Sequence, residues 1–299
     1  MPTRPERRYD IEADWVLLSR CTFRCPYCFF DPALLSRPAK SVPPEQLARF
    51  FDGTGWTWML HLTGGEPFLY PDFVELCRLL ASRHYISLNT NCQSAAVRDF
   101  VRLVKPDRVG FMNCGMHLTY RRERVGTERF VENFRLLRQS GFPAFASCVM
   151  SPELFPTFRG EWQRFADAGV VLIPKSLQGK YRGRLYPEAY SDEERGVFRE
   201  FHGLAERHYR AEFASKPEPP TVNPLLDVEL FLSAGSPDYR GRLCGAGQEF
   251  VRIREDGTIR RCGAGDVLGN VADGLFLRRS GPSICTETEC PYFCVKYAQ

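Results

Sequence analysis

The stretch DWVLLSRCTFRCPYC, residues 14–28, joins an apolar run to a short loop that carries three cysteines. Residues 14–19 are typical of a buried β-strand, and Cys21, Cys25 and Cys28 follow it directly. Thiols on one short loop can converge on a single metal centre. A [4Fe–4S] cluster normally takes four thiolates, so three leave one iron open to an outside ligand. A zinc site completed by a distant His or Cys, or three incidental thiols, are the other interpretations at this point.

The composition predicts a folded cytoplasmic protein. The chain has 299 residues, 43% of them hydrophobic, which is enough to bury a full core. Its net charge of +4, without a long run of like charges, argues against a nucleic-acid partner. The first residues are charged, and no stretch reaches the roughly 18 apolar residues of a membrane span, so we expect no membrane partner. The 12 cysteines would then be reduced, and their clustering points to metal or redox chemistry.

Short apolar runs alternate with helical patterns up to about residue 185, as they do in parallel βα units. The pattern predicts six strands, at residues 14–19, 59–63, 86–89, 108–113, 144–149 and 170–174. It predicts helices at residues 45–51, 72–82, 95–104, 127–140, 157–168 and 192–209. We therefore expect an α/β fold whose reactive groups lie at the C-terminal ends of its strands.

A second motif, Gly64-Gly65-Glu66-Pro67, follows the second predicted strand. Two glycines at a strand end let backbone carbonyls approach a ligand closely, and a carboxylate beside them suits a positively charged ammonium group. Alone, this motif is an ordinary turn.

Together, the two motifs resemble those of the radical S-adenosylmethionine (SAM) superfamily. CTFRCPYC resembles its CxxxCxφC motif, with Tyr27 as the aromatic residue, and GGEP resembles the motif that receives the methionyl amino group. The resemblance implies a partial (β/α)6 TIM-type barrel and a [4Fe–4S] cluster that binds SAM. The segment NTNC, residues 89–92, resembles the family's TNG segment and makes Asn91 a candidate cofactor contact, although Cys92 stands where Gly is usual. Ser147 is a candidate contact for the carboxylate or ribose of SAM, or else a core serine bonded to backbone.

Five further cysteines lie near the C-terminus: Cys244, Cys262, Cys285, Cys290 and Cys294. With the hairpin signal Asp256-Gly257 between them, they resemble the SPASM and Twitch domains that are appended to radical SAM barrels. Five cysteines rather than seven favour the Twitch form, with one auxiliary [4Fe–4S] cluster. Four thiolates saturate such a cluster, so Cys285 is the doubtful ligand, and zinc is the alternative metal.

The expected boundaries are a barrel at residues 9–210, a linker at 211–234 and a Twitch-like domain at 235–299.

Two side chains after the fourth strand are candidate catalytic residues. His117 can act as acid or base near neutral pH, or cap a loop. Cys114, expected at the mouth of the barrel, can donate hydrogen to a substrate radical, although buried cysteine is usually a small apolar residue.

Further along, the stretch QGKYRGRLYP, residues 178–187, can clamp a phosphate, carboxylate or sugar, or form a solvated loop.

The resemblance implies an enzyme that cleaves SAM to a 5′-deoxyadenosyl radical, with electrons from a donor such as flavodoxin or ferredoxin. We expect a small-molecule substrate, such as a sugar, aminoglycoside or nucleoside, and dehydrogenation, epimerisation or decarboxylation by an oxidoreductase or isomerase. The alternative substrate is a ribosomally made peptide. The few residues before the first strand disfavour it, because they leave no room for a leader-binding domain. A non-catalytic iron–sulfur or zinc-binding protein is a third hypothesis, which GGEP beside an incomplete cysteine triplet disfavours.

Overall fold

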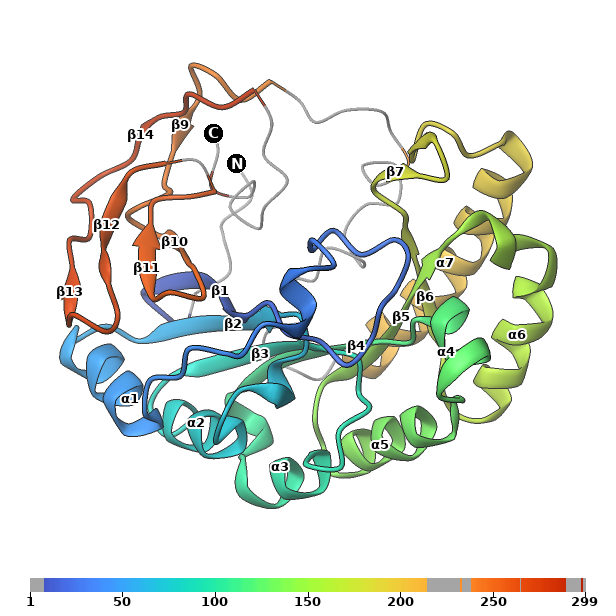
Figure 1. Ribbon diagram of the computed structural model, residues 1–299, viewed down its shortest axis with the longest axis horizontal. Helices are drawn as coiled ribbons and strands as arrows, with labels where there is room; N and C mark the ends of the chain where they lie inside the picture. The colour runs from blue at the N-terminus through green and yellow to red at the C-terminus, as the bar shows by residue number, and fades with distance from the viewer. Residues whose placement is uncertain (1–7, 214–231, 233–237, 264, 289–296, 298–299) are drawn as a thin grey trace.

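The computed structural model describes residues 8–213, 232, 238–263, 265–288 and 297 (Figure 1). Its centre is a curved sheet in which six neighbouring parallel strands follow the order of the chain. These strands are β1 (Ile11–Leu18), β2 (Trp58–Gly64), β3 (Tyr85–Thr90), β4 (Val109–Gly115), β5 (Ala144–Met150) and β6 (Leu172–Ser176). All six coincide with predicted strands to within a few residues. The partial (β/α)6 barrel is therefore confirmed.

Helices connect the strands and cover the outer face of the sheet. Seven α-helices occur in the described part of the chain: α1 (Pro44–Gly53), α2 (Phe73–Leu80), α3 (Val97–Leu103), α4 (Leu118–Arg124), α5 (Glu128–Gln139), α6 (Phe155–Asp167) and α7 (Asp192–Phe213). Short 3-10 helices lie at Leu34–Ser36, Pro67–Leu69, Pro106–Arg108 and Pro152–Leu154. The predicted helices are all present, and α4 is an additional one. In α5, Phe130, Phe134 and Leu137 are four and three residues apart, so they lie on one face of the helix, and that face is buried.

The two faces of the strands enter different cores, because successive side chains of a strand point to opposite sides. Leu60, Leu88 and Met112 belong to the large core under the outer helices. Phe111 and Phe145 point the other way and pack against the C-terminal part of α7. This helix therefore closes the floor of the barrel beneath β4, β5 and β6 (Figure 1).

The C-terminal strands extend the same sheet. β10 (Phe250–Ile253) pairs in parallel with β1, and β11 (Thr258–Arg260), β12 (Val267–Asn270) and β13 (Leu275–Phe276) continue antiparallel. The predicted hairpin at Gly257 is confirmed, with φ of 82°. Side chains of β10 to β12 enter the large core of the barrel. The C-terminal region therefore shares sheet and core with the barrel, and most of the expected linker lies outside the described residues.

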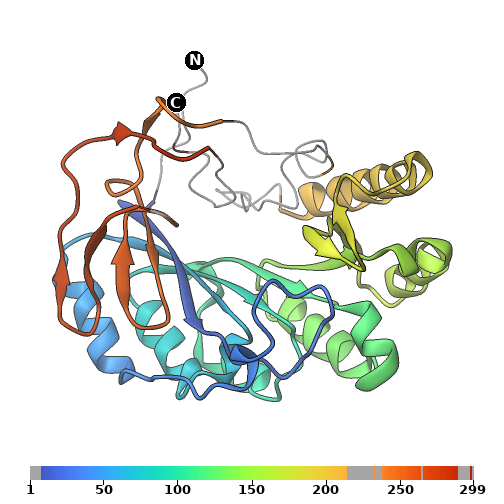
Figure 2. The same ribbon diagram turned by 45° about the horizontal axis from the view of Figure 1, so that its top comes forward.

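Two small antiparallel pairs complete the structure (Figure 2). β7 (Gly179–Tyr181) and β8 (Arg184–Tyr186) form a hairpin directly after β6, and β9 (Leu243–Cys244) pairs with β14 (Ser283–Ile284). In the described part of the chain, every helix is too short or too polar to cross a membrane.

Candidate active site

The three N-terminal cysteines lie on an ordered loop at the C-terminal end of β1. The Cys21 amide donates to Leu35 O at 3.0 Å, and the Cys28 amide donates to Cys25 O at 3.0 Å. The Arg24 guanidinium donates to the carbonyls of Cys21 and Phe23 at 2.7 and 2.9 Å. The loop thus has a defined shape through its own backbone contacts.

Gly64 and Gly65 bring the end of β2 against the chain that leads into this loop. The Gly65 amide donates to Leu18 O and the Glu66 amide to Arg20 O, both at 2.9 Å. A Cβ atom added at Gly64 would lie 2.2 Å from Leu18 O, and one at Gly65 would lie 2.2 Å from Arg20 O. The two glycines are needed because of this close backbone approach, and they position the cysteine loop.

Glu66 is buried, with 2% of its surface exposed, and joins the GGEP turn to the end of β3. Its Oε1 accepts from the Phe68 amide at 3.1 Å and the Thr90 hydroxyl at 2.8 Å, and its Oε2 accepts from the Asn91 amide at 2.7 Å. Burial raises the pKa of this carboxyl, while the three hydrogen bonds act in the opposite direction. Both oxygens already accept hydrogen bonds from the protein, and the expected contact between this carboxylate and an ammonium group stays a prediction.

The segment after β3 keeps the conformation of a glycine turn. Cys92 has φ of 56°, in the left-handed region, so the cysteine adopts the backbone that Gly would favour there. The Asn91 side chain reaches the cysteine loop and donates to Thr22 Oγ1 at 3.2 Å. Asn91 therefore lies beside the cysteine loop, where a cofactor contact is expected.

Arg121 is a buried cation beside these segments that the sequence analysis missed. It has no exposed surface and donates to Met116 O at 2.5 Å, to Gln93 Oε1 at 2.6 Å and to Asn91 O. Its guanidinium also lies 4.9 Å from the ring centre of Phe23 in the cysteine loop. Burial lowers its pKa to about 10, so the group is still charged at neutral pH. Four arginines lie within residues 121–129, and their pattern does not distinguish the buried one.

His117 packs against the cysteine loop as a neutral ring. Its Nδ1 lies 3.3 Å from the Tyr27 hydroxyl, and its ring meets Phe23 edge-on at 5.8 Å. Burial, with the charges of Arg121 and Lys175, lowers the pKa of His117 to about 3. An imidazole with this pKa is not a proton donor at neutral pH. Its position fits the support of Tyr27 rather than acid catalysis.

A family model described as the Radical SAM superfamily matches residues 15–158, which contain the cysteine loop and the GGEP turn. These residues form a radical SAM domain.

Named relatives share this domain and parts of the remaining chain. The PqqA peptide cyclase of Gluconobacter oxydans (strain 621H) is 25% identical over 280 residues, which cover 86% of this chain and 71% of that protein. A GTP 3′,8-cyclase of Haemophilus ducreyi (strain 35000HP / ATCC 700724) is 38% identical over 78 residues, 24% of this chain and 23% of that protein.

Two solved structures share the fold. The structure of anSMEcpe with bound AdoMet and Kp18Cys peptide matches with a TM-score of 0.56 and 16% identity, covering 88% of this chain and 78% of that one. The structure of Streptococcus suis SuiB bound to precursor peptide SuiA matches with a TM-score of 0.55 and 13% identity, covering 89% and 63%.

The family implies a [4Fe–4S] cluster and SAM, and the thiols of the cysteine loop fit such a cluster. Burial and the neighbouring thiols raise the pKa of Cys25 to about 12, and Cys21 and Cys28 contribute to that shift, so the three groups are close neighbours. Among the described residues, however, no three His, Cys, Asp or Glu side chains are placed to share one metal ion.

The interior of the radical SAM barrel is polar above its floor. The Ser147 hydroxyl donates to Asn113 Oδ1 at 2.7 Å, and Asn113 Nδ2 donates to Asn89 Oδ1 at 2.8 Å. Ser147 is thus bonded to a side chain and not to backbone. The three residues form a polar row across β3, β4 and β5.

Cys114 points away from this row. It is fully buried in the large apolar core, and its thiol contacts that of Cys92. Because neighbouring residues of a strand face opposite sides, Asn113 enters the barrel and Cys114 does not. Its position does not support the expected catalytic role.

A second buried polar group near the floor also escaped the sequence analysis. His61 Nε2 lies 2.7 Å from Glu12 Oε1, His61 Nδ1 lies 2.5 Å from Ser87 Oγ, and the Tyr297 hydroxyl donates to Glu12 Oε2 at 2.5 Å. Glu12, His61 and Ser87 come from β1, β2 and β3. In the sequence, the only signal of this group is a single polar residue within each of three otherwise largely apolar strands.

Three of the C-terminal cysteines share one buried core. Cys244, Cys262 and Cys285 pack there with Phe250 and Tyr297. Since Cys244 precedes β10, which runs parallel to β1, this core lies at the opposite end of β1 from the cysteine loop. Cys285 therefore belongs with the other two. The remaining cysteines of the set, 290 and 294, lie outside the described residues.

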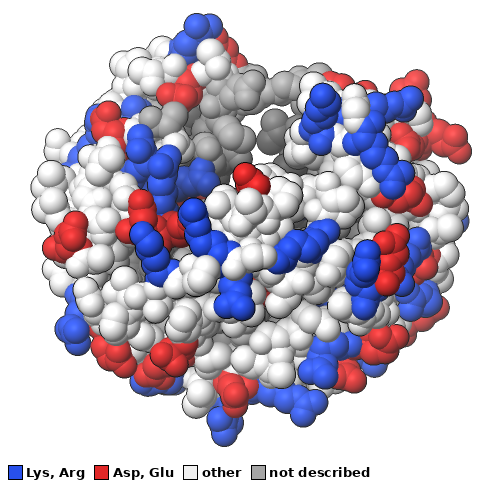
Figure 3. Space-filling view, in the orientation of Figure 1, with Lys and Arg blue, Asp and Glu red and all other residues white. Residues whose placement is uncertain are grey.

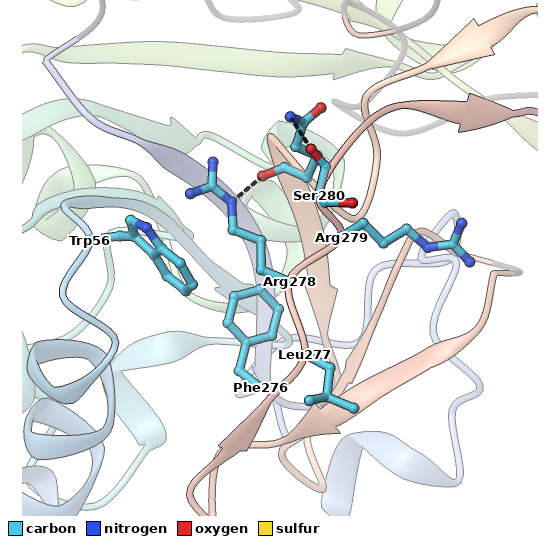
Figure 4. A pocket seen from close by; sticks show the side chains of 7 residues that line it. Trp56, Phe276, Leu277, Arg278, Arg279 and Ser280 are labelled. Atoms are coloured by element: carbon cyan, nitrogen blue, oxygen red, sulfur yellow. Dashed lines mark hydrogen bonds between the residues drawn. The ribbon is translucent and has the colours of Figure 1, made fainter.

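A cavity of about 510 Å³ lies away from the radical SAM site, beside the start of β2 (Figure 4). Arg278 stacks 4.8 Å above the ring centre of Trp56, donates to Gln248 O at 2.7 Å and donates to Asp10 O at 3.1 Å. Phe276 meets Trp56 edge-on at 5.9 Å. These contacts join the C-terminal strands to the N-terminal end of the barrel.

Proposed function

We propose that this radical SAM enzyme abstracts a hydrogen atom from a peptide substrate inside the barrel. The observation that carries the proposal is the match to the PqqA peptide cyclase, which extends over 86% of the chain and so includes the C-terminal region. The GTP 3′,8-cyclase match covers 24% of the chain and carries no information on the substrate. A peptide thus replaces the small molecule expected from the sequence.

Cys21, Cys25 and Cys28 would hold the cluster, and the open iron site would receive SAM. When bound, the cluster supplies the electron that cleaves SAM to a 5′-deoxyadenosyl radical. A reduced flavodoxin or ferredoxin is the proposed electron donor, in a cytoplasmic setting without membrane or nucleic-acid partners.

The chain's own residues would orient SAM and exclude water. Gly64 and Gly65 hold the end of β2 against the cysteine loop, as their backbone contacts require. Buried Arg121 supplies a fixed positive charge beside the loop. The Asn113 and Ser147 side chains offer polar contacts within the barrel for SAM or substrate. Such pre-organised groups favour the reaction because they need no rearrangement when it occurs.

We assign an auxiliary [4Fe–4S] cluster of the Twitch type to the C-terminal cysteines. The shared core of Cys244, Cys262 and Cys285 supports this assignment. The two cysteine sets flank β1, so a substrate in the barrel would lie between them. This arrangement suits an oxidation of the substrate radical, while an isomerase would instead return hydrogen to it.

The experiment uses anaerobically reconstituted enzyme with SAM, dithionite and a library of short synthetic peptides. We expect release of 5′-deoxyadenosine, and mass spectrometry should show a peptide whose mass changes only when SAM is present. A Cys25→Ala variant should release none. Release by that variant would overturn the cluster assignment, and SAM-dependent conversion of a small molecule in place of every peptide would overturn the substrate class. Deuterated solvent separates isomerisation, which incorporates deuterium, from oxidation, which loses two hydrogens.

A further inference from the structure

The β7–β8 hairpin stands at the mouth of the barrel and is not part of the barrel sheet. It follows β6 directly, so it leaves from the end of the strands that also carries the cysteine loop. Its two strands pair only with each other among the described strands. Figures 1 and 2 show it facing β10 and β11 across the mouth.

The hairpin has a rigid base. Tyr181 and Tyr186 are each 5% exposed, and the Tyr181 hydroxyl donates to Glu153 Oε1 at 2.6 Å. Arg182 and Gly183 form the two-residue turn, with φ of 47° and 79°. Positive φ at both turn residues matches the twist of a tight hairpin. These contacts hold the hairpin in place, although no other described strand flanks it.

The two edges of this ribbon differ. The Leu185 carbonyl of β8 accepts from the Ala189 amide at 2.9 Å, so the following turn covers that edge. β7 has no second neighbour among the described strands. An open strand edge presents backbone N–H and C=O groups that can pair with another extended chain.

The hairpin is also strongly basic. Residues 179–186 contain Lys180, Arg182 and Arg184, all exposed, and no acidic residue. Arg182 lies 3.6 Å from Glu153, whereas Lys180 and Arg184 have no ion-pair partner in the described part of the chain. Many other surface arginines are paired, for example Arg159 with Glu200 at 2.7 Å. Figure 3 shows basic side chains gathered on this rim of the molecule.

We propose that the free edge of β7 docks the peptide substrate as an added strand, with an acidic side chain beside Lys180. Arg184 belongs to β8 and lies on the other face, so it adds positive charge to the hairpin without facing the added strand. Main-chain hydrogen bonds would supply affinity and the unpaired cations would supply selectivity, as in other strand additions. Leu185, which is 58% exposed, lies on the Lys180 face and offers an apolar contact beside the charge. The inference rests on the proposed function, because it requires a peptide substrate.

A lysine on an edge strand has another explanation, because charged edge residues also prevent unwanted strand pairing. In that case its charge would protect the edge and bind nothing. The two explanations predict opposite effects of charge reversal on peptide binding.

The test measures anisotropy of a fluorescein-labelled twelve-residue peptide of alternating Glu and Val, added to reconstituted enzyme. A Lys180→Glu/Arg184→Glu variant should bind it about tenfold more weakly, since the ion pair at Lys180 becomes repulsive and the hairpin loses its positive charge. A matched Arg98→Glu/Lys105→Glu variant, with one change in α3 and one just after it and both residues exposed, should bind normally. A Gln and Val peptide should bind weakly to every form. N-methylation of alternate backbone amides should abolish binding if the peptide adds as a strand.

Equal binding by the two double variants would overturn the proposal, and so would tight binding of the N-methylated peptide. Turnover separates this inference from the proposed function. If a peptide is modified with unchanged KM in Lys180→Glu/Arg184→Glu, docking at β7 is wrong and peptide modification stands. If no peptide is modified while a small molecule is, the proposed function is wrong.

Discussion

Glu66 Oε2 accepts a hydrogen bond of 2.7 Å from the backbone amide of Asn91, so the turn after β2 is tied to the end of β3. Since Asn91 in turn contacts Thr22, this bond links GGEP to the cysteine loop through the interior. Glu66 is therefore a positioning residue in the radical SAM domain.

A Glu66→Gln variant should lower the free energy of unfolding by about 1–3 kcal/mol, because an amide nitrogen would face a buried N–H or O–H donor. Urea unfolding measures the loss. The exposed residue Glu45 provides the control, and Glu45→Gln should change little. A variant as stable as the parent would show that the three hydrogen bonds contribute nothing net.

Gly65→Ala should displace the cysteine loop, because the new Cβ would meet Arg20 O at 2.2 Å. We expect iron content after reconstitution to fall by about half or more, because overpacking that shifts the backbone typically costs about 1–3 kcal/mol. Gly160→Ala in α6 is the control, since a Cβ there meets nothing within 4 Å. Normal iron content in Gly65→Ala would contradict the close approach of β2 to the loop.

Cys114→Ala should leave 5′-deoxyadenosine release and product formation unchanged, because the thiol faces the core and not the barrel interior. Stability should fall by about 1 kcal/mol through lost packing. A variant that still cleaves SAM but no longer forms product would instead place Cys114 at the substrate.

His84 should make the fold less stable in mild acid. Burial lowers its pKa to about 4, and the Trp58 amide donates to its Nδ1 at 3.3 Å, so the folded state holds it neutral. The folded pKa lies below the unfolded value of about 6.5, so its contribution is present above pH 6.5 and falls as the pH drops toward 4. Between pH 7.5 and 5 we expect a loss of about 1–2 kcal/mol in urea unfolding. His84→Gln should remove this contribution to the pH dependence of the free energy of unfolding. The control His208→Gln, at an exposed residue, should leave that pH dependence unchanged.

Cys285→Ala should lower the iron content of reconstituted enzyme from about eight to about four per chain. The reason is that Cys285 shares the buried core of Cys244 and Cys262. Cys77→Ala, at a buried site in the large core, should retain the full content. Full iron in Cys285→Ala would identify Cys285 as the spare thiol.

The sequence by itself determined the chemistry of the site and the order of the barrel strands. The three cysteines and the GGEP turn are local patterns, so their spacing shows which groups are present without knowledge of distant contacts. The six strands were predicted for a similar reason, since apolar runs and helical spacing are properties of neighbouring residues.

Only the tertiary structure decided where the side chains point. β4 is buried on both faces, so its sequence could not show that Asn113 enters the barrel and Cys114 does not. The burial of Arg121, the three donors on Glu66 and the pairing of β10 with β1 likewise depend on segments far apart in the chain. Such contacts arise from strand register and close packing, which a local pattern does not encode.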